Sequence, residues 1–186
     1  GTEEEEESEN IHYSKWLKIY NYPVQLCLME KMDFILEDVL EQGNISNIEW
    51  ISILFQIVYA LTLLQQKFNM IHNDLHSDNI MFIKTKKRFL YYSVNDKLYV
   101  VPTFGKIVKI IDFARATYNI GKLTFFPSVF EVGGDAEGQY SQPQNGKWAN
   151  EDVTPNPSFD LARLATTIYE YFNEDSDIHK LLYSWT

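Results

Sequence analysis

Apolar residues that recur every three or four positions predict one long helix in the middle of the chain. Ser46 and Glu49 precede this pattern with the spacing of a capping box, in which each side chain binds a backbone N–H group that the helix leaves without a partner. The periodic residues share one face of the helix, so we expect them to belong to the core. They are Trp50, Ile51, Leu54, Ile57, Val58, Leu61, Leu64 and Phe68.

Shorter patterns flank this helix on both sides. An apolar run at residues 23–29 predicts a buried strand, and Asp33 is placed to cap a short helix over residues 34–41, which a Gln-Gly-Asn sequence then ends. After the long helix, apolar and β-branched runs predict strands, two of which flank the hairpin turn Asn95-Asp96. These strands are expected at residues 80–83, 90–94, 97–101 and 107–111.

Periodicity is lost beyond the last of these strands. Residues 113–158 are rich in Gly, Pro, Ser and Asn and predict a long irregular segment, which in a compact domain is usually functional or mobile. A second amphipathic helix is expected over residues 159–172. The predicted fold class is therefore mainly α with small β-hairpins.

Composition narrows the class of protein further. The chain has 186 residues, 45% of them hydrophobic, which suits one globular domain or most of one. No apolar run approaches the roughly 20 residues of a membrane span. The single cysteine, Cys27, excludes an internal disulfide and is typical of a reducing compartment. We therefore expect an intracellular protein, in the cytoplasm or nucleus, that does not bind a membrane.

The net charge of −10 comes largely from one end of the chain. Residues 3–9 hold six acids, and without them the net charge is −4. Such a run repels itself and buries nothing, so residues 1–10 are predicted to be an acidic disordered tail or loop. A net acidic chain is also a poor candidate for nucleic-acid binding, which needs Lys and Arg to neutralise phosphates.

Two short motifs between these elements contain the polar residues of phosphoryl-transfer chemistry. His-Asn-Asp-Leu-His-Ser-Asp-Asn at residues 72–79 lies between the long helix and a strand, and Ile-Ile-Asp-Phe-Ala at residues 110–114 ends another strand. Taken singly, either motif is explained by a cap, a turn or a buried histidine. Together, in this order and with these flanking elements, they resemble the catalytic loop and the metal-binding segment of eukaryotic-type protein kinases.

The resemblance implies roles for individual residues. Asp74 would orient the attacking hydroxyl and accept its proton, while Asn79 and Asp112 would hold the Mg²⁺ that bridges the phosphates of ATP. His76 occupies the position of a lysine that contacts the transferred phosphate, which makes it a second catalytic candidate. Asp160 resembles the buried Asp that anchors the backbone of the catalytic loop. A plain acid at a helix N-terminus is the other explanation of Asp160.

Upstream residues resemble the strand and hinge between the two lobes of a kinase. By this resemblance the C=O of Glu30 and the N–H of Met32 bind the adenine edge, and Met81 forms the apolar floor beneath the base. Residues 11–32 are accordingly predicted to be the end of the N-lobe and the hinge. Residues 33–186 are predicted to be a kinase C-lobe, incomplete at its C-terminus, that runs to the long helix after the activation segment.

Several details resemble the haspin-like kinases, which include kinases of large DNA viruses. His76 gives the loop Asp-Leu-His, and a long insert with a hairpin pattern separates Asn79 from Asp112. No Ala-Pro-Glu closes the activation segment, and Phe-Asp-Leu-Ala-Arg-Leu opens the last long helix. The resemblance covers residues 22–175. It implies transfer of phosphate from ATP to a Ser or Thr hydroxyl of a protein substrate, for which a basic peptide is one candidate.

The chain also departs from the kinase pattern. It contains no Gly-rich loop and no Val-Ala-x-Lys strand, so we expect residues 1–186 alone to bind nucleotide weakly and to show no kinase activity. Asn73 replaces the Arg that pairs with phosphate in the activation loop, and Ala114 replaces the Gly of the metal-binding motif. Two alternatives stay open: a small-molecule phosphotransferase of the aminoglycoside type, which shares Asp-Leu-His followed by Asn, and a pseudokinase that serves as a scaffold.

Overall fold

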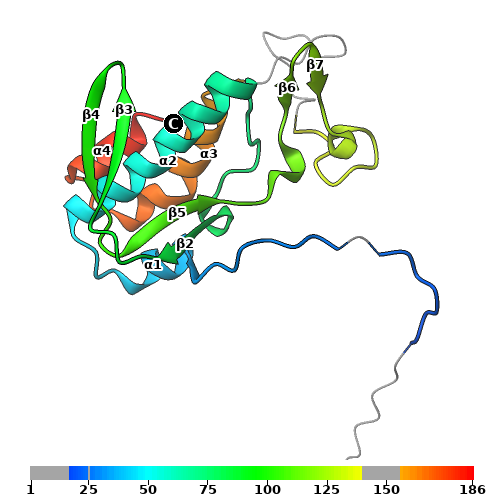
Figure 1. Cartoon of the computed structure of the whole chain (residues 1–186), viewed down its shortest axis with the longest axis horizontal. Helices are drawn as coiled ribbons and strands as arrows, with labels where there is room; N and C mark the ends of the chain where they lie inside the picture. Colours follow the sequence, from blue (N-terminus) through cyan, green and yellow to red (C-terminus); the bar gives the residue numbers. More distant parts are fainter. Residues whose placement is uncertain (1–16, 25, 140–155) are drawn as a thin grey trace, which may run out of the picture. The chain divides into compact units, whose positions relative to one another are not determined.

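The computed structural model describes residues 17–24, 26–139 and 156–186 and divides the chain into two units, residues 1–30 and 31–186 (Figure 1). The described residues of the first unit form no helix or strand, so the strand predicted at residues 23–29 is wrong for the part described. A strand needs hydrogen bonds to a neighbouring strand, and none of the sheets in the described residues includes this segment. Its apolar side chains are exposed, Leu28 by 86%. The predicted acidic tail lies outside the described residues.

The core of the second unit is built around α2, Asn47–Phe68. Ser46 caps this helix as predicted and accepts a bond from the Glu49 N–H at 3.4 Å. The Glu49 carboxylate pairs with Lys106, so it does not close the predicted capping box. Asn69 caps the C-terminal end of the helix, and its φ of 46° is a left-handed conformation that Asn tolerates better than most residues.

The buried face of α2 is wider than the predicted stripe. Ser52, Ile53 and Gln56 are buried although they lie outside the periodic pattern. Ser52 Oγ donates to the Pro102 carbonyl at 2.5 Å, and Gln56 Oε1 accepts from the Val108 N–H at 3.0 Å, so strands cover this second side of the helix. Two residues of the predicted stripe face solvent instead. They are Ile51 and Phe68, which are 56% and 44% exposed.

Among the helices of the described residues, α2 alone is long and apolar enough to cross a membrane, judged by length and composition. The central helix of a globular core passes the same test. Ile53, Ile57 and Leu61 of α2 are at most 3% exposed and pack within the core cluster. These apolar residues of the helix therefore belong to the core of the unit.

A three-stranded antiparallel sheet packs on α2. Its strands are β1 (Phe34–Ile35), β2 (Ile80–Lys84) and β5 (Lys106–Ile110), with β2 in the centre. One face of the sheet belongs to the core, where Phe34 stacks on Phe82 with ring centroids 5.1 Å apart. The register places Ile35, Met81 and Lys109 together on the opposite face.

The short helix α1 spans Leu36–Gln42, and Asp33 does not cap it. Asp33 instead joins β2: its N–H donates to the Phe82 carbonyl at 2.8 Å, and its carboxylate accepts from the Lys84 N–H at 2.6 Å. Asp38 supplies an acceptor for a backbone N–H at the start of the helix. The prediction of this cap was wrong because the acceptor was assigned from local spacing, whereas Asp33 bonds to a strand far along the chain.

Gly43 ends α1 in the left-handed conformation, with a φ of 62°. A Cβ at this position would meet no atom within 4 Å, so a substitution acts on the backbone alone. We expect Gly43→Ala to lower the free energy of unfolding by about 1 kcal/mol, because alanine pays a steric penalty at positive φ. Urea denaturation measures this loss, and the neighbouring exposed Asn44→Ala, as a control, should change stability by less than about 0.5 kcal/mol. Equal effects of the two substitutions would contradict the assignment.

Two antiparallel hairpins extend the fold beyond the central sheet. β3 (Phe89–Val94) and β4 (Lys97–Pro102) form the hairpin predicted around Asn95-Asp96, whose φ values of 47° and 61° suit a type I′ turn. The second hairpin, β6 (Tyr118–Ile120) and β7 (Leu123–Phe125), lies in a segment for which the sequence predicted no regular structure. Three-residue strands are too short to produce a detectable alternation, which explains this error. Residues 140–155 of the same segment lie outside the described residues.

The helices α3 (Phe159–Ile168) and α4 (Asp177–Tyr183) complete the described part of the chain. α3 ends four residues earlier than predicted, because a 3₁₀ turn at Tyr169–Tyr171 brings Phe172 edge-on to Trp50, with ring centroids 5.0 Å apart. The described residues form a mixed fold of four helices and three small antiparallel sheets, with more strand than the predicted class implied.

Candidate active site

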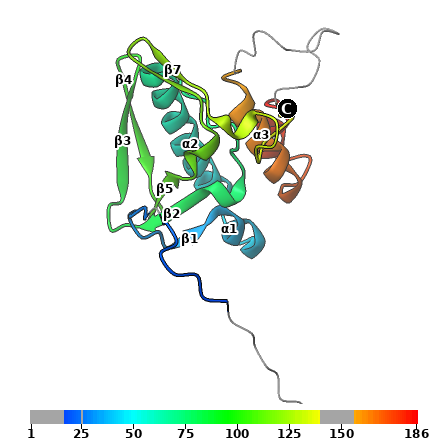
Figure 2. The ribbon, with the colours of Figure 1, turned by 90° about the vertical axis from the view of Figure 1, so that its right-hand side faces the viewer.

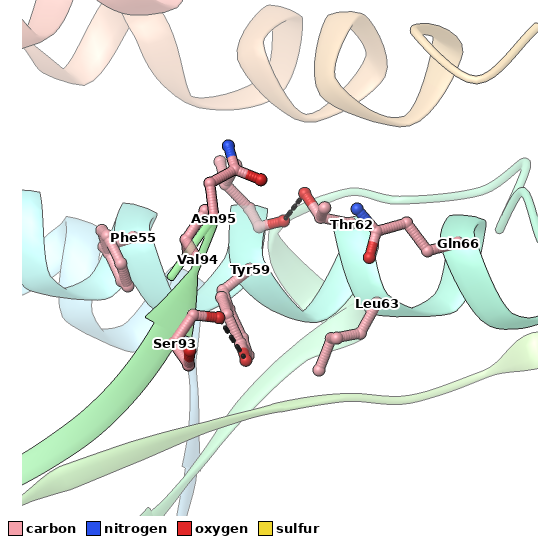
Figure 3. A pocket seen from close by; sticks show the side chains of 9 residues that line it. Phe55, Tyr59, Thr62, Leu63, Gln66, Ser93, Val94 and Asn95 are labelled. Atoms are coloured by element: carbon pink, nitrogen blue, oxygen red, sulfur yellow. Dashed lines mark hydrogen bonds between the residues drawn. The ribbon is translucent and has the colours of Figure 1, made fainter. Parts of the chain in front are cut away.

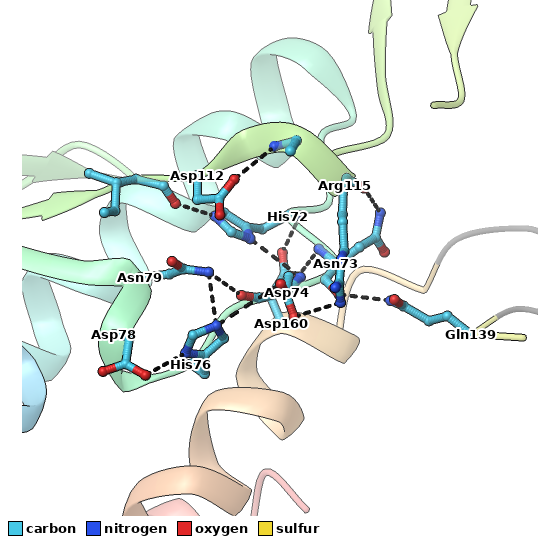
Figure 4. A network of polar contacts seen from close by, with 12 residues as sticks. His72, Asn73, Asp74, His76, Asp78, Asn79, Asp112, Arg115, Gln139 and Asp160 are labelled. Carbon is cyan, nitrogen blue, oxygen red and sulfur yellow. Dashed lines mark hydrogen bonds and ion pairs between the residues drawn. The ribbon is translucent and has the colours of Figure 1, made fainter. Parts of the chain in front are cut away.

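A buried carboxylate orders the loop that contains the predicted catalytic residues. Asp160 lies in the first turn of α3 and is 0% exposed. Its two oxygens accept bonds from the backbone N–H groups of His72 and Asn73, at 2.8 and 2.9 Å (Figure 4). Burial raises the pKa of the Asp160 carboxyl, and the two N–H bonds act in the opposite direction. The sequence between α2 and β2 is thus tied to a helix far along the chain.

His72 connects this loop to the strand that precedes Asp112. It is 1% exposed, and its Nε2 lies 2.8 Å from the Ile111 carbonyl. A carbonyl only accepts, so Nε2 bears the ring proton and Nδ1 accepts the Asp74 N–H at 3.3 Å. The imidazole also packs on Phe113, with ring centroids 5.0 Å apart. His72 is therefore a positioning residue that fixes the backbone on both sides of the site.

Asn73, which stands where kinases usually have Arg, has a structural role of its own. Its φ is 68°, and it is 1% exposed. The side-chain amide donates to the Arg115 carbonyl at 2.9 Å and to Thr117 Oγ1 at 3.3 Å. The Asn73 carbonyl in turn accepts from Gln139 Nε2 at 2.7 Å. The short amide thus joins the loop to the segment after Asp112.

Asn79 closes the other end of the loop, in the 3₁₀ turn Ser77–Asn79. Its Nδ2 donates to the Asp74 main-chain carbonyl at 2.9 Å, which sets the orientation of the amide. The same nitrogen lies 3.0 Å from His76 Nε2, which therefore accepts, and the ring proton is on Nδ1, 3.6 Å from Asp78 Oδ2. Oδ1 of Asn79 is the amide atom left to bind a metal.

Asp74 lies at the centre of this network with a side chain that is 16% exposed. Arg115 Nη1 is 3.1 Å from Asp74 Oδ1, and His76 Nε2 is 4.0 Å from Asp74 Oδ2. Sequence reasoning missed Arg115. Its position three residues after Asp112 is the only signal that could have drawn attention to it.

Helix α1 supports the loop from another side. The Tyr171 hydroxyl donates to Glu37 Oε1 at 2.6 Å, and the Ser77 hydroxyl also bonds to this carboxylate. These two bonds, the Ser77 bond more than the Tyr171 bond, lower the pKa of the Glu37 carboxyl. The charge of Glu37 thus helps to hold the 3₁₀ turn that contains Asn79.

Asp112 follows β5 in a left-handed conformation, with φ 60° and ψ 70°. Such a conformation is uncommon for a residue with a side chain and often marks a functional site. Asp112 is exposed, and its Oδ1 accepts from the Ala114 N–H at 3.3 Å. The preceding residue, Ile111, donates its N–H to the Asn79 carbonyl at 3.0 Å, so the two predicted metal ligands follow adjoining stretches of backbone.

The residues present fit a magnesium ion that also binds phosphate. The described residues contain no group of three or more His, Cys, Asp and Glu side chains that could hold a metal on its own. An amide oxygen from Asn79 and a carboxylate from Asp112 are the hard oxygen ligands that Mg²⁺ prefers. Magnesium usually completes its shell with waters and substrate phosphates, so two protein ligands suffice when a nucleotide is present.

The predicted nucleotide-binding residues Glu30, Met32 and Met81 belong to two different units of the chain. Met81 lies in β2, half-buried, on the sheet face that also bears Ile35 and Lys109. Met32 is half-buried just before β1, whereas Glu30 is the last residue of the first unit and is exposed. The adenine contacts of Glu30 and Met32 and the floor role of Met81 stay predictions.

Comparison with known proteins reveals partial homology to haspin kinases. The chain is 39% identical over 62 residues to the serine/threonine-protein kinase haspin of Mus musculus, which is 33% of this chain and 8% of the mouse protein. It is 31% identical over 75 residues (37% of this chain, 16% of the relative) to an Acanthamoeba polyphaga mimivirus protein provisionally named as a serine/threonine-protein kinase. An uncharacterised protein of Caenorhabditis elegans is 33% identical over 66 residues (36% of this chain, 22% of the relative).

These similarities are short. The chain spans less than a quarter of the length of the curated relatives it matches. No family model matches the chain. The predicted resemblance to haspin-like kinases, viral kinases among them, is confirmed as homology over about a third of the chain.

Proposed function

We propose that this chain is the catalytic lobe of a haspin-like kinase and transfers phosphate from ATP to a Ser or Thr hydroxyl of a protein substrate. The observation that carries the proposal is the pair of hydrogen bonds that the Asp160 carboxylate accepts from the N–H groups of His72 and Asn73. An acid that only interacts with the positive end of a helix can do so while exposed to solvent, so the full burial of Asp160 against this loop indicates a further role. As an anchor, Asp160 supports a loop that holds Asp74 and Asn79 in adjoining positions.

The residues of the loop divide the chemistry between them. Asp74 accepts the proton of the attacking hydroxyl, and Arg115 orients its carboxylate through Oδ1. His76 Nε2 is 4.0 Å from Asp74 Oδ2, and in this proposal the imidazole donates a hydrogen bond to the transferred phosphate after a change of tautomer. Asn79 and Asp112 hold Mg²⁺, which neutralises charge on the phosphates of ATP when bound. Met81 provides apolar surface for the adenine base.

Phosphate transfer, measured on the protein as its gene encodes it, tests the proposal. Labelled ATP and Mg²⁺ are offered with a library of Ser and Thr peptides that includes basic ones, and in parallel with aminoglycosides. Labelled peptide supports the proposal. Labelled aminoglycoside without labelled peptide would mean that the protein is a small-molecule phosphotransferase instead. If neither is labelled although the protein binds nucleotide, the pseudokinase scaffold replaces the proposal.

Asp112→Asn should weaken the binding of magnesium-nucleotide. Loss of a residue that only hydrogen-bonds a metal ligand lowers metal affinity roughly 10- to 100-fold. Loss of the negative charge of the ligand itself should therefore lower the affinity for magnesium-nucleotide at least about tenfold. Calorimetric titration of the full-length protein with ATP at fixed Mg²⁺ measures the change. Asp175→Asn provides the matched control, because this exposed Asp follows the 3₁₀ turn Tyr169–Tyr171 and lies outside the site. Equal affinity in the Asp112 and Asp175 variants would exclude Asp112 as a metal ligand.

A further inference from the structure

The β3–β4 hairpin exposes a contiguous apolar face that the proposed function does not use. In β3 the exposed residues alternate with half-buried ones, so Phe89 and Tyr91 point away from α2. The register pairs Tyr91 with Val100 and Ser93 with Leu98 across the hairpin. Tyr91, Leu98 and Val100 are 67%, 68% and 53% exposed. We refer to Phe89, Tyr91, Leu98 and Val100 together as the outer hairpin face.

The opposite face of the hairpin is held on α2, which fixes the outer face in space. Tyr92 packs edge-on against Phe55 and Tyr59, with ring centroids 5.2 and 4.6 Å away. The Tyr59 hydroxyl donates to the Ser93 carbonyl at 3.4 Å, beside a cavity of about 250 Å³ between α2 and the end of β3 (Figure 3). Both views of the ribbon show the hairpin alongside α2 (Figures 1 and 2). The outer face is therefore presented by a supported hairpin.

Basic residues border the outer hairpin face at its base. Lys86, Lys87 and Arg88 are consecutive and exposed, just before β3. They line a hollow of about 380 Å³ together with Phe104, which is 41% exposed. A second hollow of about 530 Å³ runs from Lys87 to Tyr91. Within the described residues, no ion pair engages these three cations, although the chain has a net charge of −10.

We propose that the outer hairpin face binds an acidic segment of a partner protein that also bears apolar side chains. Exposed apolar surface with a polar border is typical of protein-binding sites. Leu98 and Val100 add aliphatic surface to the rings of Phe89 and Tyr91, and the net charge of −10 disfavours a nucleic acid, which binds through many neutralised phosphates. The border of Lys86, Lys87 and Arg88 selects a partner of negative charge.

Other occupants fit these observations less well. In a two-fold dimer the same patch meets itself, so the basic borders of two copies would repel each other or remain without partners. An anionic membrane is an extended surface, so it would attract the three cations but also approach and repel the acidic remainder of a chain of net charge −10, whereas a short peptide contacts only the hairpin. An acidic peptide matches the apolar face and its border together.

The proposal is tested with the chain and a labelled peptide in which Glu alternates with Leu and Val. Fluorescence anisotropy should show binding that weakens with added salt. A peptide with Lys in place of Glu, and one with Ser in place of Leu and Val, should each bind at least about fivefold more weakly, the equivalent of about 1 kcal/mol. Equal binding of the three peptides would overturn the proposal.

Variants of the chain place the binding on the hairpin. Lys87→Glu and Val100→Ser should each weaken the binding of the Glu peptide about fivefold or more, whereas Lys122→Glu, the same charge change in the turn between β6 and β7, should leave it unchanged. Circular dichroism checks that each variant is folded. Binding that falls equally in the Lys122 variant would overturn the proposal, because net charge alone would then explain it.

Two further measurements address the rejected occupants. Sedimentation of the chain alone reports self-association, and a dimer that Val100→Ser abolishes would assign the face to a second copy. Sedimentation with vesicles of phosphatidylserine and phosphatidylcholine reports membrane binding. Binding to these vesicles without binding to the Glu peptide would assign the face to a lipid surface. Either result overturns the proposal.

Discussion

Asp74→Asn in the full-length protein should lower the rate of phosphate transfer by about 10²- to 10⁴-fold, the usual range for removal of a general base. Asn retains the shape of Asp and can still accept a hydrogen bond, but it cannot take the proton of the attacking hydroxyl. Nucleotide affinity should change little, because the predicted metal ligands are Asn79 and Asp112. Transfer to a Ser peptide and titration with ATP measure the two quantities separately.

The structure predicts that this substitution leaves the loop in place. Asn79 Nδ2 binds the main-chain carbonyl of residue 74, and the N–H of residue 74 donates to His72 Nδ1, so neither bond needs the carboxylate. Asp175→Asn is the control: the same chemical change is made at an exposed Asp outside the site. The control should keep at least about half of the parent rate. Equal rates for both variants would show that Asp74 is not the proton acceptor.

The ion pair of Arg115 with Asp74 changes the interpretation of Asn73, which differs from the kinase motif. Asn73 replaces an Arg, which predicts one positive charge fewer near the loop. The structure has a guanidinium beside Asp74 all the same, supplied by Arg115 from the segment after Asp112. Asn73 itself holds the Arg115 carbonyl at 2.9 Å and so helps to place that residue. One hydrogen bond therefore links Asn73 to the residue that supplies the positive charge.

The parts of the site that could be predicted from the sequence depend on local spacing. Asp74 and Asn79 lie five residues apart in a loop between a helix and a strand, and Asp112 directly follows a strand. The spacing placed the first pair in one loop, and the bond from Asn79 to the Asp74 carbonyl agrees with this. Arg115 could not be predicted in the same way, because its partner lies in a different segment and many arginines near a turn are solvated.

The errors in the fold have the same origin. Asp33 has the spacing of a helix cap, yet it accepts a bond from Lys84, in a strand that sequence spacing does not relate to it. Residues 23–29 have the composition of a buried strand, but a strand also needs a partner, and no described sheet provides one. Apolar periodicity reports how a segment can be buried. It does not report which segment covers it.

Asp160→Ala should cost about 2 to 6 kcal/mol of stability, because the buried N–H groups of His72 and Asn73 would each lose their acceptor and each such loss costs about 1 to 3 kcal/mol. Removal of a carboxyl whose pKa is raised by burial recovers part of its desolvation cost, so the lower half of this range is expected. A helix N-terminal acid without these bonds would contribute only about 0.3 to 1 kcal/mol. Denaturation in urea therefore distinguishes the two explanations of Asp160 that the sequence left open.

Asp177→Ala is the matched control for Asp160→Ala, because Asp177 also lies in the first turn of a helix, α4, but is exposed. It should lose no more than about 1 kcal/mol. Asp160→Asn should fall between the two, since one amide oxygen can still accept a bond while the NH₂ group faces a second donor. We also expect Asp160→Asn to lower the rate of phosphate transfer, because His72 and Asn73 set the position of Asp74. A stability loss for Asp160→Ala no larger than that for Asp177→Ala would mean that the two bonds do not hold the loop.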